Sequence, residues 1–340
     1  MRAMVLHQLM PVTDNAEPLH LEEWPEPEPG DGEVLLRLRS CGVCHTELDE
    51  IEGRTAPSLP RIPGHEAVGE VVALGTGVRE PAVGTRVGVA WIYSACGECK
   101  PCRAGRENLC PEFRATGRDA HGGYADYMVA PAAYVHPIPK AIADTDAAPM
   151  LCAGAIGRRS LRLAELENGQ VLGLTGFGGS NHQVLELAQC LLPDSPILVW
   201  ARDPAQREQA RNAGAAWAGD TGEDAPMRAD AIIDTTPAWK PVLAALEKLA
   251  PGGRLVINAI RKEDRDRALL AELDYPSQLW MEKEVRSVAN VTRQDVREFL
   301  ELAANHGLRP VTETLPLEDA NRALRELRTG PVRGAKVLVM

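Results

Sequence analysis

The sequence predicts an α/β protein in two parts, one rich in short β-strands and one built as a doubly wound parallel sheet. Three observations predict it. Valine-rich runs punctuated by glycine and proline fill the first 140 residues, strand and helix patterns alternate over 170–290, and a mixed tail ends in the strand-like run AKVLVM. The length of 340 residues exceeds what one hydrophobic core usually organises, so we expect two domains.

The first part is expected to contain short strands and tight turns. EVLLRLRS (33–40) predicts a strand, and AVGEVVALG (67–75) and GTRVGVAW (84–91) are further runs bounded by glycines. The segment EEWPEPEPGDGE (22–33) is a polar, proline-rich connection.

The second part alternates between two hydrophobic periods, which predicts parallel strands buried on both faces and joined by helices. The predicted strands are 170–176, 197–201, 229–236, 253–260 and 284–290, and the predicted helices are 154–166, 180–192, 204–214 and 238–250. In the tail, helices are expected at 292–307 and 318–330, an extended run at 310–317 and a strand at 335–340. A last strand usually pairs with structure already built, so we expect the tail to complete the first part.

Charge and composition exclude several function classes. The net charge of -11 argues against a nucleic-acid surface and against docking on anionic lipid. No run of 18 apolar residues occurs, so no membrane span is expected, and MRAMVLHQLM does not resemble a signal peptide. We therefore expect a cytoplasmic protein, in which cysteines are more often metal ligands than disulfides.

A glycine loop follows the strand at 170–176 and opens the next helix. In GLTGFGGSNH, the G-x-G-x-x-G positions are taken by Gly176, Gly178 and Asn181, so the third glycine is missing. Such a loop admits a pyrophosphate at a helix N-terminus. We expect the residues of GFGG to contact a dinucleotide, namely Gly176, Phe177, Gly178 and Gly179.

The end of the next strand bears on the choice between NAD and NADP. An NAD-preferring fold usually has an acid there, whereas this chain has Ala201 followed by Arg202. An arginine can hold a 2′-phosphate, which leans toward NADP. Alternatively, Arg202 is only solvated and Asp203 caps the following helix.

Four cysteines lie together in CGECKPCRAGRENLC. Thiolates in one loop can close a tetrahedron around Zn²⁺, as in structural zinc sites. An iron–sulfur cluster also accepts four cysteines, and spacing alone does not exclude it. The fold context favours zinc for the set Cys96, Cys99, Cys102 and Cys110.

The remaining candidates are scattered. SCGVCHTELDE (40–50) could be a redox pair, half of a metal site, or neither. IPGHEAVGE supplies His65 and Glu66, which alone would be an ordinary surface pair, and APMLCAG supplies Cys152. Together these segments offer a possible Cys-His-Cys zinc set with an open position, and Glu66 as an optional fourth ligand.

Five motifs in order carry a resemblance over essentially the whole chain: GVCHTE, GHEAVGEVVALGTGV, CGECKPCRAGRENLC, APMLCAG and GLTGFGG. With them the sequence resembles the zinc-dependent alcohol dehydrogenases of the medium-chain dehydrogenase/reductase family. The resemblance implies a GroES-like catalytic domain at 1–150, completed by 291–340, and a Rossmann domain at 151–290. It also implies reversible hydride transfer between an alcohol and its aldehyde or ketone, two Zn²⁺ per chain, NAD(P), and a homodimer or homotetramer.

The resemblance also implies roles for single residues. The catalytic zinc ligands would be Cys44, His65 and Cys152, with Glu66 beside the metal, and Cys41 and Cys190 would be core residues. His45 and Lys336 would meet the cofactor phosphates, Thr46 would hydrogen-bond the substrate oxygen, and Trp91 would line the alcohol pocket. The pocket also depends on residues near Thr55, Trp280 and Asn290.

Two acids depart from the family pattern. Glu47 stands where the family often has an aspartate that braces the zinc-bound histidine, and Asp49 stands where it often has a histidine at the outer end of a proton relay. The alternatives are a zinc-dependent reductase of larger, cinnamyl-type aldehydes, a non-enzymatic dinucleotide-binding relative, and a thioredoxin-like oxidoreductase using Cys41 and Cys44.

Overall fold

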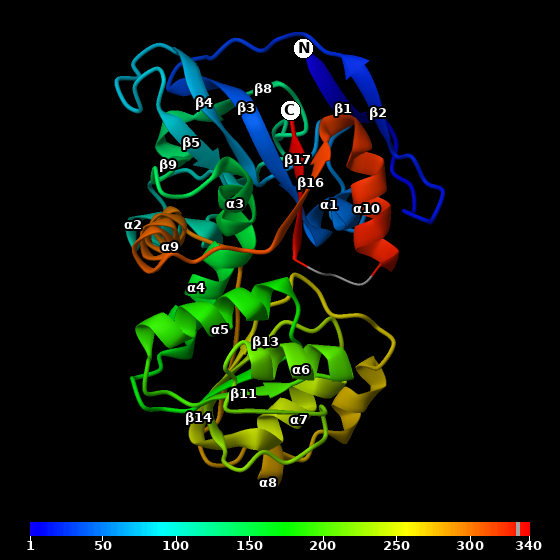
Figure 1. Ribbon diagram of the computed structural model, residues 1–340, viewed down its shortest axis with the longest axis vertical. Helices are drawn as coiled ribbons and strands as arrows, with labels where there is room; N and C mark the ends of the chain where they lie inside the picture. Colours follow the sequence, from blue (N-terminus) through cyan, green and yellow to red (C-terminus); the bar gives the residue numbers. More distant parts are fainter. Residues whose placement is uncertain (331–333) are drawn as a thin grey trace. The chain divides into compact units, whose positions relative to one another are not determined.

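The computed structural model describes residues 1–330 and 334–340, and the chain divides into two compact units (Figure 1). Unit 1 comprises Met1–Ala155 and Val291–Met340, and unit 2 comprises Ile156–Asn290. The C-terminal tail therefore belongs to the N-terminal unit, and Cys152 lies in the same unit as Cys44 and His65.

Unit 1 contains a seven-stranded sheet within the described residues, with the order β16-β17-β3-β4-β5-β9 and with β8 paired to β3. The long strand β3 (Glu33–Val43) is antiparallel to both β4 and β17, and Lys336 of β17 lies opposite Val43. The other strands are β4 (Ala67–Leu74), β5 (Arg86–Val89), β8 (Tyr127–Pro131), β9 (Val135–Pro137), β16 (Thr312–Pro316) and β17 (Ala335–Val339).

Smaller elements surround this sheet. β1 (Arg2–Leu6) pairs with β2 (Leu19–Glu23), and β6 (Ile92–Ser94) pairs with β7 (Arg114–Ala115). The helices are α1 (His45–Ile51), α2 (Lys100–Arg103), α3 (Asp144–Pro149), α9 (Arg293–His306) and α10 (Ala320–Thr329), with a π-helical turn at Met150–Gly154 and 3-10 turns at Glu107–Leu109, Ala132–Tyr134 and Leu317–Asp319. Figure 1 shows α10 packed beside α1, so the tail supports the segment that contains Cys44.

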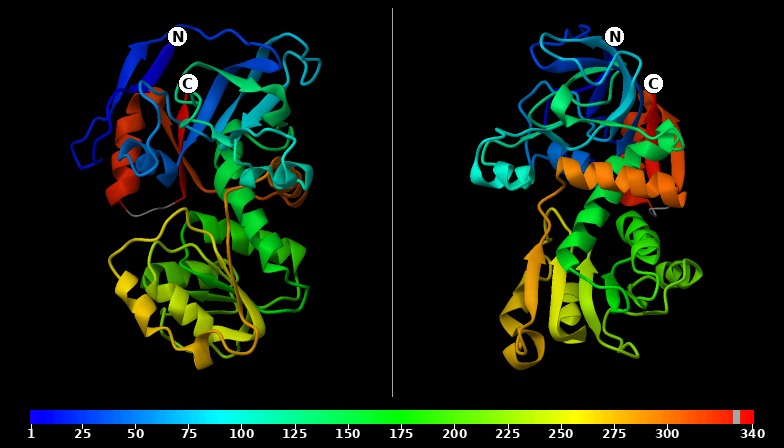
Figure 2. Two further views of the ribbon diagram at one scale, coloured as in Figure 1. Left: turned by 180° about the vertical axis from the view of Figure 1, so that it is seen from behind. Right: turned by 90° about the vertical axis from the view of Figure 1, so that its left-hand side faces the viewer.

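Unit 2, all of which is described, is a six-stranded parallel sheet with the order β12-β11-β10-β13-β14-β15. Every residue of β10 and β11 is buried, as expected for strands covered on both faces. Helices surround the sheet in both views of Figure 2. The strands are β10 (Leu172–Thr175), β11 (Ile197–Trp200), β12 (Trp217–Gly219), β13 (Ala229–Asp234), β14 (Leu249–Ile257) and β15 (Glu284–Ser287), and the helices are α4 (Ala155–Ala164), α5 (Gly179–Leu191), α6 (Pro204–Asn212), α7 (Lys240–Lys248), α8 (Tyr275–Gln278) and the 3-10 helix Arg267–Glu272.

The predicted α/β architecture, with a β-rich part and a doubly wound parallel sheet, is confirmed. One strand start was wrong. β14 was expected at residue 253, after a turn at PGG, but it begins at Leu249 and carries PGG inside it as an irregularity in its pairing with β13. Gly252 takes a positive φ of 72° there, which glycine adopts without strain. The segment His45–Ile51, for which the sequence predicted no element, forms helix α1.

Candidate functional site: two groups of metal-ligating side chains

The four-cysteine lobe brings its thiols together. The sulfur atoms of Cys96, Cys99, Cys102 and Cys110 all lie within 4.8 Å of one another. Cys96 Sγ accepts hydrogen bonds from the backbone N–H of Cys99 at 3.4 Å and from the thiol of Cys110 at 3.5 Å. The backbone N–H of Cys99 is the main reason why the pKa of Cys96 falls to about 7. Four thiols with backbone N–H support fit a closed tetrahedral metal site.

A buried acid anchors this lobe within unit 1. Glu107, 5% exposed, accepts hydrogen bonds from the backbone N–H of Arg293 at 3.0 Å and from its Nε at 3.1 Å. The Arg293 guanidinium also lies 4.7 Å from the ring centroid of Tyr134. Because Arg293 is the first residue of α9, these contacts fix the lobe to the N-terminus of that helix.

The second group is assembled from three separate segments of unit 1. One ligand atom from each of Cys44, His65, Glu66 and Cys152 lies within 4.8 Å of the others. Cys44 is the N-cap of α1, the His-Glu pair directly precedes β4, and Cys152 lies in the π-helical turn Met150–Gly154. Short π-helical turns are often found at functional sites.

The Glu66 side chain packs against the backbone of Gly42 on β3 and leaves no room there for a Cβ atom. A Cβ added to Gly42 would lie 1.8 Å from a carboxylate oxygen of Glu66. Any side chain at residue 42 would therefore displace Glu66 from the group. Cys41, one residue earlier, is fully buried in the hydrophobic core and does not belong to either group. Cys190, expected in the core, is only partly buried on α5.

Glu47 holds the group in place through both of its carboxylate oxygens. One oxygen accepts the backbone N–H of Cys44 at 2.8 Å, and the other lies 2.5 Å from Nδ1 of His65. Burial opposes protonation of His65, but the Glu47 carboxylate raises its pKa well above the ordinary value. The imidazole is oriented as in metal sites where a carboxylate braces the ligand histidine.

The other nitrogen of that imidazole has no hydrogen-bond partner among the described residues. His65 Nε2 is buried and lies 3.9 Å from a Glu66 oxygen. The Cys152 thiol lowers the pKa of Cys44 well below its ordinary value, and the pKa of Cys152 is correspondingly raised. Burial raises the pKa of Glu66. A buried, unpartnered imidazole nitrogen beside two thiols and a carboxyl fits a zinc ion held by nitrogen and sulfur.

The remaining residues predicted on α1 differ in exposure. The Thr46 hydroxyl lies 3.7 Å from Cys44 Sγ and is 8% exposed, so it lies beside the group. His45 is exposed. Asp49 is buried, and its carboxylate accepts a hydrogen bond from Arg54 Nε at 2.6 Å. Asp49 is thus tied to a cation.

Lys336 and Trp91 both have partners within unit 1. Lys336 Nζ donates to Glu313 at 2.7 Å and to Glu326 at 2.5 Å. A phosphate bound there would compete with two carboxylates. Trp91 packs on Phe113 with ring centroids 4.7 Å apart.

The glycine loop of unit 2 has the expected strand–turn–helix form. Gly176 takes a positive φ of 75° after β10, and Gly178 is the N-cap of α5, ahead of Gly179. Asn181, which replaces the third glycine, is fully buried and donates from Nδ2 to the carbonyls of Thr175 at 3.0 Å and Gly176 at 2.8 Å. The Phe177 side chain is buried, so only its backbone is available to a ligand.

The structure confirms that Asp203, two residues after the strand-end position Ala201, caps the next helix. Arg202 is exposed, and Asp203 caps α6 by accepting the backbone N–H of Ala205 at 2.9 Å. The position at which NAD-preferring folds have an acid is occupied by Ala201, which is buried.

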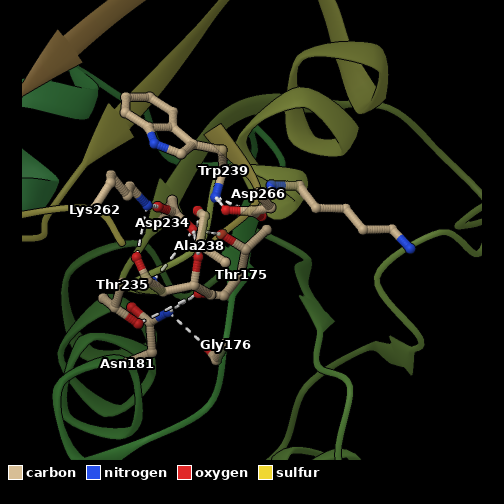
Figure 3. A network of polar contacts seen from close by, with 11 residues as sticks. Thr175, Gly176, Asn181, Asp234, Thr235, Ala238, Trp239, Lys262 and Asp266 are labelled. Atoms are coloured by element: carbon tan, nitrogen blue, oxygen red, sulfur yellow. Dashed lines mark hydrogen bonds and ion pairs between the residues drawn. The ribbon is translucent and has the colours of Figure 1, made fainter. Parts of the chain in front are cut away.

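Sequence reasoning missed a buried ion pair at the carboxyl edge of the sheet of unit 2 (Figure 3). Asp234, at the end of β13, is fully buried and pairs with Lys262, which also donates to the carbonyl of Thr236 at 2.6 Å. Asp234 accepts the Thr175 hydroxyl at 2.6 Å as well. The sequence did contain a signal for this pair: Asp234 ends the apolar strand pattern AIID, and a charge at the end of a buried strand needs a partner.

Comparisons with known proteins identify the family. Residues 30–140 match the alcohol dehydrogenase GroES-like domain, and residues 211–339 match a zinc-binding dehydrogenase. The probable alcohol dehydrogenase AdhA of Mycobacterium tuberculosis (strain CDC 1551 / Oshkosh) is 43% identical over 320 residues, covering 92% of this chain and 90% of the relative. This chain belongs to the zinc-type alcohol dehydrogenases of the medium-chain dehydrogenase/reductase family.

Further similarities agree with this assignment. An alcohol dehydrogenase of Geobacillus stearothermophilus is 34% identical, covering 96% of the chain and 97% of the relative. The crystal structure of AibC is 28% identical with a TM-score of 0.86, covering 100% and 95%. A cinnamyl alcohol dehydrogenase (SbCAD4) from Sorghum bicolor is 26% identical with a TM-score of 0.82, covering 99% and 97%. The dehydrogenase is an oxidoreductase that acts on alcohols, and it matches a family of zinc-binding dehydrogenases. Among the described residues, no helix is long and apolar enough to span a membrane.

Proposed function

We propose that unit 1 is the catalytic domain and that Cys44, His65 and Cys152 hold its catalytic zinc, with Glu66 adjacent. The observation that carries this proposal is the buried, unpartnered Nε2 of His65, aimed at two thiols and braced from behind by Glu47. The lobe holds a second, structural zinc through Cys96, Cys99, Cys102 and Cys110. Unit 2 binds the dinucleotide at the residues Gly176 to Gly179.

The reaction is reversible hydride transfer between an alcohol and its aldehyde or ketone. When bound, zinc acts as a Lewis acid that favours loss of the hydroxyl proton in one direction and polarises the carbonyl in the other. Thr46 orients the substrate oxygen, and its Oγ1 accepts the hydroxyl proton while its own proton passes on toward solvent. Asp49 is held by Arg54, so we do not assign it the outer end of a proton relay.

A substrate panel tests this function. Short alcohols, cinnamyl alcohol and the matching aldehydes are each assayed with NAD and NADP, following the absorbance of the reduced nicotinamide. We expect turnover that falls when zinc is removed by a chelator and returns when zinc is restored. Absence of turnover with every alcohol and aldehyde in protein that contains two zinc ions would contradict the proposal.

The same panel distinguishes the second candidate function, reduction of larger aldehydes of the cinnamyl type. The tilted pair Trp91 and Phe113 favours it, because aromatic side chains pack well against an aromatic substrate. A kcat/KM for cinnamaldehyde well above that for short aldehydes would support this candidate, and the reverse order would exclude it.

For the cofactor we propose a preference for NADP, supported by the exposed Arg202 and by the absence of an acid at Ala201. The double variant Ala201→Asp, Arg202→Ser should shift the ratio of kcat/KM values toward NAD. An unchanged ratio would refute the role of the arginine.

We also propose a cytoplasmic homodimer or homotetramer, consistent with eight cysteines that form no disulfide. Light scattering after size exclusion measures the oligomeric state, and a monomer would contradict it.

A further inference from the structure

Arg118 has a side chain fixed in one position. Asp119 accepts its Nε at 3.1 Å and its Nη2 at 2.7 Å, and Asp119 is itself held by the backbone N–H of Ala115 at 2.7 Å. The guanidinium also lies 5.5 Å from the ring centroid of Trp91. A guanidinium held on one edge and over one face is positioned before any ligand arrives.

The opposite edge of this guanidinium is not used within the described part of the chain. A guanidinium has five N–H donors, and Asp119 takes the edge formed by Nε and Nη2. The edge formed by Nη1 and Nη2 therefore retains the donors that match a second carboxylate. The arginine is about a quarter exposed, so this edge can be reached.

The loop that carries the arginine packs against the segment that contains His65 of the proposed catalytic zinc site. A Cβ added to Gly117, the preceding residue, would lie 3.1 Å from the backbone nitrogen of Gly64, which directly precedes His65. The backbone N–H of Thr116 donates to the carbonyl of Trp91 at 2.8 Å, so both residues that flank Gly117 connect to Trp91. This loop thus forms a wall beside the segment that presents His65.

The charges around this wall are mainly positive, although the chain as a whole carries -11. Arg61 is near enough to Asp119 and Arg114 for both to influence its pKa, which burial lowers. Arg114 lies 5.3 Å from the ring centroid of Tyr93. Of these three arginines, Arg118 is the one whose guanidinium bonds the carboxylate of Asp119, whereas Arg114 donates to the backbone carbonyl of Asp119 at 3.0 Å and Arg61 to that of Ser58 at 3.2 Å.

Glu50 is the other acid nearby, and it does not occupy the free edge. Both of its oxygens are buried without a hydrogen-bond partner in the described structure. Burial raises the pKa of Glu50 to about 8, opposed by the charges of His65 and Arg118. This carboxyl is therefore near both the arginine and the proposed zinc ligands, and it does not bond to the guanidinium.

We propose that the free edge of Arg118 binds a carboxylate carried by the substrate, so that this dehydrogenase prefers alcohols and aldehydes with a carboxylate a few carbons from the reacting carbon. The inference rests on the proposed function, because it places the arginine beside the catalytic zinc site. It adds a substrate class and a residue that selects it.

The test compares hexanal with 6-oxohexanoate, which have the same chain length and differ by a terminal carboxylate. Both are assayed with wild type, Arg118→Gln, Arg118→Lys and the control Arg79→Gln, which removes an exposed positive charge elsewhere in unit 1. The ratio of kcat/KM for 6-oxohexanoate to that for hexanal should fall about 10- to 100-fold in Arg118→Gln. It should fall less in Arg118→Lys and stay unchanged in Arg79→Gln.

A binding measurement that needs no turnover accompanies the assay. Calorimetry with hexanoate and with hexan-1-ol is performed on the zinc-loaded protein with cofactor, and thermal melts confirm that each variant is folded. Hexanoate binding that is lost in Arg118→Gln supports the proposal. A ratio that does not differ between wild type and Arg118→Gln, or hexanoate binding that persists in that variant, overturns it. If wild type reduces neither aldehyde, the proposed function fails, and the calorimetry still decides whether Arg118 binds a carboxylate.

Discussion

Unit 1 contains two groups of four metal-ligating side chains that differ in how they are built. The lobe draws four thiols from one loop between residues 96 and 110 and three of these cysteines are partly exposed. The other group draws thiols, an imidazole and a carboxyl from three segments between residues 44 and 152, and its histidine is fully buried. Four equal donors close a site, whereas a mixed set with a weakly placed carboxyl leaves a position for substrate. The difference in construction is the basis for our proposal that the lobe has a structural role and that the group of Cys44, His65, Glu66 and Cys152 has a catalytic role.

We call the set Cys44, His65, Glu66 and Cys152 the mixed group. Removing one of its ligands is the strongest test of the proposed difference between the two groups. Cys44→Ser should lose one of two zinc ions and reduce kcat about a thousandfold or more, because several kcal/mol of charge stabilisation depend on that metal. Elemental analysis and steady-state kinetics measure both quantities. The matched control is Cys41→Ser, which changes a buried thiol outside the group and should retain both zinc ions. A Cys44→Ser protein that keeps two zinc ions and full turnover would reverse the ligand assignment.

The second largest effect is expected at Glu47, which holds the His65 imidazole in place but is not itself a proposed zinc ligand. Glu47→Gln keeps the side-chain shape but removes the charge beside His65 Nδ1, so zinc affinity in the mixed group should fall about 10- to 100-fold. Competition with a chelator measures this affinity. Zinc in the lobe is the internal control, since Glu47 does not contact it, and equal weakening of both sites would show a general loss of folding instead.

Removing a lobe ligand should separate stability from chemistry. Cys102→Ser should lose the second zinc and lower Tm by roughly 10 °C, whereas kcat of the protein that remains folded should change only a few-fold. Differential scanning calorimetry and kinetics below the transition measure the two effects. A loss of kcat as large as that of Cys44→Ser would end the distinction between the two groups.

The smallest effect is expected at His136, a histidine that is buried like His65 but does not belong to either group of metal-ligating side chains. His136 on β9 is fully buried, both ring nitrogens lack partners in the described structure, and burial, aided by the charges of Arg297 and Arg293, lowers its pKa to about 3. Between pH 6.5 and 3 the unfolded chain binds a proton here that the native protein does not, so His136 lowers stability as pH falls, by up to about 1.4 kcal/mol per pH unit.

His136→Phe should remove that contribution. Urea unfolding at pH 7, 6 and 5 measures it, and the free energy of unfolding should decline less steeply toward pH 5 in the variant. Identical slopes for the two proteins would show that His136 titrates normally.

The alternation of strands and helices in unit 2 could be predicted, because the spacing of apolar residues in each segment reflects which of its own faces are buried. The lobe could also be predicted, because its spacing lies within one loop. From residue types alone the mixed group was only a possible Cys-His-Cys set, and its ligands were assigned through the resemblance, since no local rule brings residues 44, 65 and 152 together. Cys41 and Cys44 look equivalent in the sequence, and only the strand-to-helix junction after Val43 separates a core thiol from one that joins the group.

Other features had no usable signal. Helix α1 is short and buried at every residue from Thr46 to Ile51, so no amphipathic period marks it. The pairing of Asp49 with Arg54 depends on the turn that ends this helix. The ion pair of Asp234 with Lys262 joins the end of β13 to the loop after β14, and these become neighbours only when β13 and β14 pair.

Strand β17 (Ala335–Val339) lies inside the sheet of unit 1, between β16 and β3, although the whole of unit 2 separates it from β3 in the sequence. Unit 2 is continuous in sequence and can fold on the ribosome while β3 still waits for this neighbour. The segment that carries Cys44 follows directly from β3, so the mixed group can reach its final form only after β17 has been synthesised. A nascent chain stalled before residue 335 should therefore acquire a folded unit 2 but not the completed group of Cys44, His65, Glu66 and Cys152.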